Sequence, residues 1–219
     1  MKNAVLAQYK TKRDKHRTAI EDIKYIIAGK DAYTFEHCER VSYYCGLIGE
    51  SMNLPDRTRE ALKEGALLHD LGKTAIPDEI LNKQSALSDS EAKVMRRHPQ
   101  LGAAILQEAG CCKRALPMIL HHHERYNGTG YPYKLSGKQI PFYARIISVA
   151  DCYDAMTSNR SYNDAIGKKE ALRGLILNKG SQFDPDIVNS FVTAMQTTPE
   201  SHMYYIPAYS KFGAVAAAY

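Results

Sequence analysis

PFYARIISVADCYDAMT, residues 141–157, is the stretch that decides the fold class. Its apolar residues fall on nearly every side of a helical wheel, and a helix that is apolar all round is a buried helix. Elsewhere apolar residues recur at three- and four-residue spacings, while alternating strand patterns are short and rare. The sequence therefore predicts an all-α protein in which other helices surround this segment.

The remaining helices are expected before and after residues 141–157. A basic amphipathic helix is predicted over 1–30, with Gly29 as its stop and a packing or partner-binding role. A main domain is predicted over 31–197 and a tyrosine-rich tail over 198–219. Within the main domain the expected helices cover 36–52, 56–70, 88–98, 101–110, 116–123, 168–178 and 184–195. Their signals include a Ser88–Glu91 capping box and a break at Pro99, just after His98.

Composition limits the class of protein. The chain has 219 residues, 44% hydrophobic and 24% charged, as in an ordinary globular domain. Its net charge of +5 is modest and its basic run, residues 10–17, is best interpreted as a solvated helix face, so no nucleic-acid partner is predicted. No secretory signal or membrane span of about 20 apolar residues is evident, and five cysteines without a CxxC pair favour a reducing cytoplasm.

Histidines and aspartates are placed where an apolar core is expected. Each histidine alone is most simply a core residue with satisfied hydrogen bonds, but six of eight lie in helical stretches beside inward-pointing residues. Asp70 follows one of them directly, and Asp151 lies inside the apolar helix. Such buried charges are costly unless they share a cation. Nitrogen and oxygen donors without a thiolate cluster favour iron or manganese over a structural zinc. The six histidines are His37, His69, His98, His121, His122 and His123.

Several motifs, in order along the chain, resemble the HD-GYP domain family. They are His37 followed by Arg40–Val41, HDLGK at 69–73, HPQLG at 98–102, HHERYNGTGYP at 122–132, ARIISVADCYDAMTSNRSY at 144–162 and GSQFDP at 180–185. The resemblance covers roughly residues 31–195. It implies an HD-superfamily helical bundle with an internal metal site. It also implies a phosphodiesterase that opens cyclic di-GMP to linear pGpG, with further cleavage to GMP left open.

The resemblance also implies a ligand set for two transition-metal ions, most simply iron and alternatively manganese. The positions that match the family's ligands for one metal are His37, His69, Asp70 and Asp151. Those for the second are His98, His122 and His123, with Asp70 bridging. Some family members hold a third metal with a glutamate, and here Tyr33 stands at that position. A third metal is therefore not expected.

The implied mechanism is attack on the phosphodiester by a hydroxide held between the two metals, about 3.5–4 Å apart. Asp70 as bridging ligand and Lys73 as phosphate or leaving-group contact are the candidate catalytic residues, with an ordinary salt bridge as the alternative for Lys73. Arg160 matches a position that contacts substrate phosphate. A second basic residue usual in the family is replaced by Asn163, which leaves the preferred nucleotide open.

The loop carrying Gly128, Gly130, Tyr131 and Pro132 places an aromatic ring on a glycine-containing segment directly after two implied ligands. It is predicted to serve as a lid, with a loop closed by a packed tyrosine as the simpler alternative. In the family this loop is also linked to contact with GGDEF-type proteins, so a protein of that type is a candidate regulatory partner.

Two alternative functions stay open at this stage. One keeps the site but changes the substrate to another cyclic dinucleotide, a nucleotide or a phosphate ester, and Asn163 favours it. The other is a metal-containing sensor or scaffold that binds a cyclic dinucleotide without cleaving it. The lack of the third-metal glutamate supports this second alternative, whereas the complete set of implied ligand types opposes it.

Overall fold

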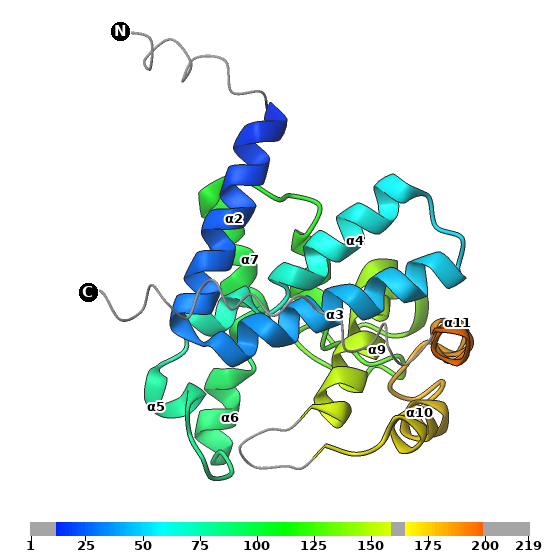
Figure 1. Cartoon of the computed structure of the whole chain (residues 1–219). Coiled ribbons are helices and arrows are strands. Elements are labelled where there is room, and N and C mark those ends of the chain that lie inside the picture. Colours follow the sequence, from blue (N-terminus) through cyan, green and yellow to red (C-terminus); the bar gives the residue numbers. More distant parts are fainter. Residues whose placement is uncertain (1–11, 159–164, 199–219) are drawn as a thin grey trace, which may run out of the picture.

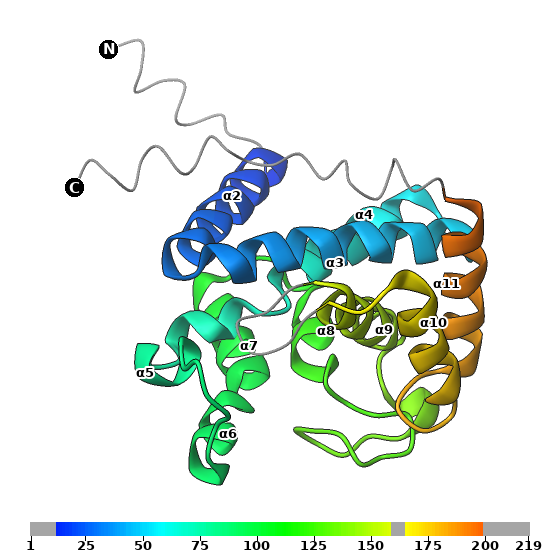
Figure 2. The ribbon, with the colours of Figure 1, turned by 60° about the horizontal axis from the view of Figure 1, so that its bottom comes forward.

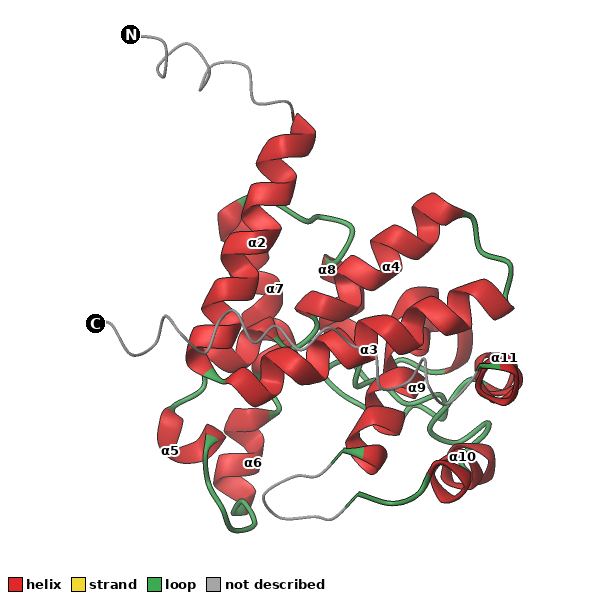
Figure 3. Cartoon of the chain, viewed as in Figure 1, coloured by secondary structure: helices red, strands yellow, loops and turns green. Residues whose placement is uncertain are grey.

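The structure is a computed structural model that describes residues 12–158 and 165–198. Within these ranges every regular element is a helix or a short 3₁₀ turn, and no strand is formed (Figure 3). None of the helices described is long and apolar enough to cross a membrane. All five cysteine thiols are free. The predictions for residues 1–11, Arg160, Asn163 and 199–219 lie outside the described residues.

The helices follow one another with short connections. In chain order the elements are α2 (Lys12–Lys30), α3 (Ala32–Ser51), α4 (Asp56–Leu68), η2 (Leu71–Ala75), α5 (Asp78–Leu81), α6 (Asp89–Met95), α7 (His98–Ala109), α8 (Leu116–His121), η3 (Gly137–Gln139), α9 (Phe142–Thr157), α10 (Lys168–Leu177) and α11 (Pro185–Thr197). In Figure 1, α3 runs across the molecule, α10 and α11 lie at one end, and α5 and α6 form a separate small lobe.

Helix α9 lies in the interior, as its sequence predicts. Turning the molecule shows it beneath α3 and beside α8 and α10 (Figure 2). Most of its circumference is buried, including Ala144, Ile146 and Ile147, while Ser148, Cys152 and Ala155 on the remaining side are half-buried. The prediction of an all-α bundle around residues 141–157 is confirmed.

The buried apolar residues form two clusters. The larger joins α3, α4, α9, α10 and α11 around residues such as Ile48, Tyr153 and Phe191. The smaller joins α2, η2, α7 and α8 around Ile27 and Leu106. Helices α3, α4 and α8 contribute to both clusters, so the polar residues they carry between these apolar contacts lie deep in the molecule.

Some predicted boundaries and faces need correction. Helix α3 begins at Ala32 rather than at residue 36, because the Asp31 side chain accepts a hydrogen bond from the Tyr33 amide and caps the helix there. Helix α2 continues through Gly29 to Lys30. The apolar stripe expected on this helix included Ile23, Ile26 and Ile27; Ile23 and Ile27 are buried, but Ile26 is 56% exposed and lies outside the packed face.

The break at Pro99 is present but displaced. Helix α6 ends at Met95, and α7 starts at His98 with Pro99 in its first turn. A proline is tolerated there because first-turn amides have no partner within the helix. The Ser88–Glu91 capping box is formed as predicted, and Asp184 caps α11. Consequently His98 points inward from the start of a helix rather than from its end.

Candidate metal centre

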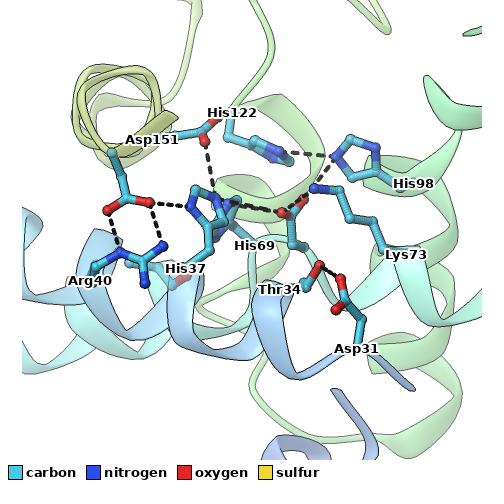
Figure 4. A network of polar contacts seen from close by, with 12 residues as sticks. Asp31, Thr34, His37, Arg40, His69, Lys73, His98, His122 and Asp151 are labelled. Atoms are coloured by element: carbon cyan, nitrogen blue, oxygen red, sulfur yellow. Dashed lines mark hydrogen bonds and ion pairs between the residues drawn. The ribbon is translucent and has the colours of Figure 1, made fainter. Parts of the chain in front are cut away.

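Five separate segments bring the predicted ligands together. His37 comes from α3, His69 and Asp70 follow α4, His98 opens α7, His122 and His123 follow α8, and Asp151 lies on α9 (Figure 4). Two groups of three have ligand atoms within 4.8 Å of one another: His37, His69 and Asp70, and His98, His122 and His123. These groups match the division into two sites that the sequence predicts. Asp151 reaches the first group through a distance of 3.2 Å from its Oδ1 to His37 Nε2.

Close backbone packing accounts for the meeting of Asp70 and His98. The η2 turn that follows Asp70 lies against the first turn of α7. A Cβ on Gly72 would collide with the His98 carbonyl oxygen and the Gly102 amide. Only glycine fits such an approach of two backbones. The glycine of HDLGK therefore brings Asp70 Oδ1 to 3.3 Å from His98 Nε2.

Three histidines share a backbone contact that fixes their tautomer. The carbonyl three residues earlier accepts a hydrogen bond from Nδ1 of each ring: Ala66 with His69 at 2.6 Å, Met95 with His98 at 2.9 Å, and Ile119 with His122 at 2.7 Å. A carbonyl oxygen only accepts, so the proton must be on Nδ1. In the neutral ring Nε2 is then unprotonated, and its lone pair can bind a metal.

These Nε2 atoms point at one another instead of at hydrogen-bond donors. His98 Nε2 lies 3.2 Å from His122 Nε2, and buried His69 Nε2 has no hydrogen-bond partner. Burial lowers the pKa of His98 to about 4 and that of His122 well below its usual value. Both rings are therefore neutral at pH 7, and neither can donate to the other. A cation between them removes this unfavourable contact, so the residues fit a bound metal.

His37 is held differently, by a residue that the sequence analysis missed. Asp154 is completely buried, and its Oδ2 accepts from His37 Nδ1 at 2.7 Å. The Arg40 guanidinium donates to both oxygens of the same carboxylate, at 2.7 and 3.0 Å. Burial opposes a charge on His37, but Asp151 and Asp154 outweigh it and raise the pKa of the ring. Carboxylate support of this kind orients a metal-binding imidazole.

One signal in the sequence pointed to Asp154. It lies three residues after Asp151 in the helix judged apolar on nearly all faces, so the two carboxylates share one side of α9. A second carboxylate in a buried helix needs a buried partner as much as the first does.

Asp70 lies between the two groups and is paired with Lys73. Lys73 Nζ is 2.6 Å from Asp70 Oδ2, so the salt bridge considered as the alternative role of Lys73 is present. Burial would raise the pKa of Asp70, but Lys73 and the surrounding histidines hold it well below its usual range. Burial likewise acts against the charge on Lys73, and Asp70 outweighs it and raises the pKa of Lys73. Both groups are charged at neutral pH.

The loop with Gly128, Gly130, Tyr131 and Pro132 is anchored by Glu124. This carboxylate is 2% exposed and accepts hydrogen bonds from the amides of Tyr133 and Leu135, at 2.7 and 3.1 Å. A Cβ on Gly130 would collide with the backbone of Glu124 and Arg125. Glu124, the residue after the matched histidine pair, therefore supports the backbone of the loop.

Tyr131, the tyrosine of this loop, lies on the metal-facing side. Its ring stacks on the His123 ring with centroids 4.9 Å apart and planes 29° from parallel. Two cavities, with volumes of about 410 and 420 Å³, are both lined by Tyr131. The first is lined by Tyr33, His37 and His98, the second by Asp70 and Asp151, and both by Lys73 and His123. Of the four loop residues, Tyr131 is therefore the one that contacts a candidate ligand and lines both cavities.

Tyr33 and His121 lie outside the two groups of clustered ligand atoms. Tyr33 lies at the rim of the first cavity, 37% exposed, with the Arg40 guanidinium 5.9 Å from its ring centroid. His121, the histidine before the matched pair, points away from the ligand groups toward Glu124 and Tyr133. It is therefore not among the clustered ligand atoms.

The chain is similar to several curated proteins. It is 36% identical over 196 residues to the cyclic di-GMP phosphodiesterase response regulator RpfG of Xanthomonas campestris, covering 88% of this chain and 51% of the relative. It is 42% identical over 174 residues to a cyclic di-GMP phosphodiesterase of Pseudomonas aeruginosa, covering 77% and 41%. It is 32% identical over 181 residues to a 3′3′-cGAMP-specific phosphodiesterase of Vibrio cholerae, covering 80% and 34%. The chain thus spans at most about half the length of these relatives.

Solved structures share the fold. The HD domain of the Listeria monocytogenes phosphodiesterase PgpH in complex with cyclic di-AMP superposes with a TM-score of 0.62 at 20% identity, covering 80% of this chain and 93% of that one. A HDG"Y"P protein from Bdellovibrio bacteriovorus gives 0.61 at 22%, covering 74% and 52%. The HD domain family matches residues 22–187, which include all the clustered histidines and both aspartates. The chain therefore belongs to the HD domain family.

Proposed function

We propose that this protein is a metal-dependent phosphodiesterase that hydrolyses cyclic di-GMP to the linear dinucleotide pGpG. The observation that carries the proposal is the pair of unprotonated Nε2 atoms of His98 and His122, 3.2 Å apart beside the Asp70 carboxylate. The names of the similar proteins, cyclic di-GMP and 3′3′-cGAMP phosphodiesterases, supply the substrate class.

The proposed cofactor is a pair of iron ions, with manganese as the alternative. His37, His69, Asp70 and Asp151 would hold one ion, and His98, His122 and His123 the other, with Asp70 shared. When bound, the pair supplies a coordinated water of lowered pKa and neutralises charge on the phosphate. A count of two is proposed because Tyr33 stands where a carboxylate would serve a third ion.

The chain's own residues position the substrate. The Lys73 ammonium lines both cavities, is charged at neutral pH and is 24% exposed on its side chain, so one of its protons is available to a phosphate oxygen. Its other contact, with Asp70, holds it beside the metal ligands. The loop with Tyr131, which lines both cavities, is proposed to act as a lid over bound substrate. Arg160 is proposed as a further phosphate contact from the sequence alone.

A second candidate substrate is 3′3′-cGAMP. It is favoured by the relatives of that specificity and by Asn163, where a basic residue is usual. A GGDEF-type regulatory partner and a cytoplasmic location remain predictions from the sequence.

The test is hydrolysis of cyclic di-GMP and 3′3′-cGAMP by anaerobically purified protein loaded with iron or manganese. The proposal expects about two metals per chain and a linear dinucleotide product, with metal and activity both lost in His69→Ala and Asp70→Ala. His121→Ala is the matched control, because it removes a neighbouring histidine that is not among the clustered ligand atoms. Two metals without cleavage of either nucleotide would favour the sensor function, and full metal occupancy in Asp70→Ala would overturn the ligand assignment.

A further inference from the structure

The second cavity, of about 420 Å³, contains two arginines beside the candidate metal centre. Its wall includes the ligands Asp70 and Asp151 together with Arg96, Arg125 and Tyr131. Arg96 comes from the end of α6 and Arg125 from the segment after α8. The two side chains thus approach the same cavity from different parts of the chain. The cavity's volume is within the range of small-ligand sites, about 300–1,000 Å³.

The carboxylates of this cavity are already engaged by other groups. Asp70 is paired with Lys73, Asp151 contacts His37, and Glu124 accepts two loop amides. Neither Arg96 nor Arg125 forms an ion pair or a side-chain hydrogen bond with another described residue. Two permanent positive charges on exposed side chains therefore line the cavity without an anionic partner among the described residues.

The first cavity has a different charge balance. Its cations are Lys73, which both cavities share, and Lys83. Lys83 is bound to both carboxylate oxygens of Glu91, at 2.8 and 2.6 Å. The unpaired positive charge of the region is therefore concentrated on the Arg96 and Arg125 side of Tyr131.

Tyr131 connects the two arginines to the metal ligands. The Arg96 guanidinium lies 5.9 Å from the Tyr131 ring centroid, and that ring stacks on His123. Burial raises the pKa of Tyr131, as do Asp70 and Asp151, while Arg96 and Arg125 act in the opposite direction.

We propose that Arg96 and Arg125 form a binding site for the phosphate that is not cleaved in a cyclic dinucleotide. The inference rests on the proposed function, since it takes a cyclic dinucleotide as the ligand. Such a ring carries two phosphodiesters, so when one lies against the metal ligands the other must lie to one side of them. Guanidinium groups bind phosphate oxygens with charge-assisted hydrogen bonds, and the second cavity is the side where such groups lie unpaired. The site would distinguish a two-phosphate ring from a simple phosphodiester.

The experiment compares two substrates in metal-loaded protein. One is cyclic di-GMP and the other is bis(p-nitrophenyl) phosphate, which has one phosphodiester and nothing to occupy a second phosphate site. The variants are Arg96→Gln, Arg125→Gln and their combination, with Arg57→Gln on α4 as the matched control. Each arginine contributes about 10-fold to binding of the ring, as expected for a charge-assisted hydrogen bond. Relative to KM for the single diester, each single variant should therefore raise KM for cyclic di-GMP about 10-fold and the double variant about 100-fold.

A structural role for Arg96 under Tyr131 predicts a different pattern. A disturbed loop would impair both substrates equally and would not be rescued by lysine. The phosphate site instead predicts that Arg96→Lys and Arg125→Lys recover most of the lost affinity, because the charge is kept. Metal content of every variant should equal that of the unaltered protein.

The outcomes separate this inference from the proposed function. If the unaltered protein cleaves cyclic di-GMP and the double variant keeps KM within about twofold, the inference is overturned and the proposed function stands. If the unaltered protein binds the ring without cleaving it, the same loss must appear in Kd for the inference to stand. If it neither binds nor cleaves the ring, both proposals are overturned.

Discussion

Substituting Asp154 by asparagine tests whether the network behind His37 supports metal binding. The change keeps the shape of the side chain and removes its charge. The amide oxygen can accept from His37 or Arg40, but its NH₂ group then faces a donor. The Arg40 guanidinium, 21% exposed on its side chain, loses its paired carboxylate. Leaving one partner of such a pair unmatched costs about 3 kcal/mol.

The effect on metal affinity is separate from the effect on stability. Loss of a carboxylate that orients a metal-binding histidine lowers metal affinity about 10- to 100-fold. The ion on the His37 side should be lost first, so that titration with Mn²⁺ shows one weakened site and one nearly unchanged site. Thermal unfolding of the metal-free variant should shift down by about 10 °C, from about 3 kcal/mol in a domain of this size.

A matched control is available in the same fold. Asp184 is 4% exposed and is paired with Arg145 on α9, away from the two ligand groups. Asp184→Asn removes the charge from a comparable buried pair, and asparagine still caps α11. It should lower stability without weakening either metal site. Unchanged metal affinity in Asp154→Asn, with stability lowered as in Asp184→Asn, would refute the orienting role of Asp154.

Three further predictions follow from the packing and charges. Gly72→Ala should disrupt the packing of η2 against α7 and abolish metal binding. Gly167→Ala, where a Cβ meets nothing within 4 Å, should preserve both the packing and the metal, and equal metal content in the two variants would contradict this prediction. Glu124→Ala should leave metal content intact and free the loop amides, seen as faster amide hydrogen exchange at 133 and 135; unchanged exchange would show that the loop is held elsewhere. Acidification should destabilise the metal-free chain, because the pKa of His98 is about 4 in the folded state and about 6.5 in the unfolded state. Between these pH values unfolding takes up a proton, so His98 lowers the free energy of unfolding by about 3 kcal/mol at pH 4. His37, with a raised pKa, acts in the opposite sense, since its stabilisation is present below about pH 6.5 and is lost as pH rises through the folded value. A higher urea midpoint at pH 4.5 than at pH 7 would contradict the dominance of the buried neutral histidines.

The fold class and the inward placement of the histidines were predictable because they depend on local patterns, whereas the division of the ligands between two ions came from the resemblance to the HD-GYP family. Apolar residues on nearly every side of residues 141–157 predict a buried helix, and histidines beside inward-facing residues of other helices are expected inside as well. Helix ends were less certain, since α3 starts where the Asp31 side chain caps it, and Pro99 lies in the first turn of α7 although a proline there could equally have ended a helix. These depend on side-chain geometry that spacing does not encode.

Support for the ligands was the part that sequence spacing did not reveal. Asp154 is 117 residues from His37, and the Glu124 carboxylate acts on amides 9 and 11 residues later. Whether such a carboxylate faces solvent or a buried donor is decided by tertiary packing. The unpaired state of Arg96 and Arg125 is likewise visible only when the carboxylates around them are seen to be engaged elsewhere.

The most direct test of the central claim is anomalous X-ray diffraction from crystals of the protein loaded with manganese. The account predicts one anomalous peak among the Nε2 atoms of His98 and His122 and the ring of His123, and a second among His37, His69 and Asp151, with Asp70 between the two. A map without anomalous density between His98 and His122, in protein shown to be folded, would contradict the account, because those two lone pairs would then face each other without a cation.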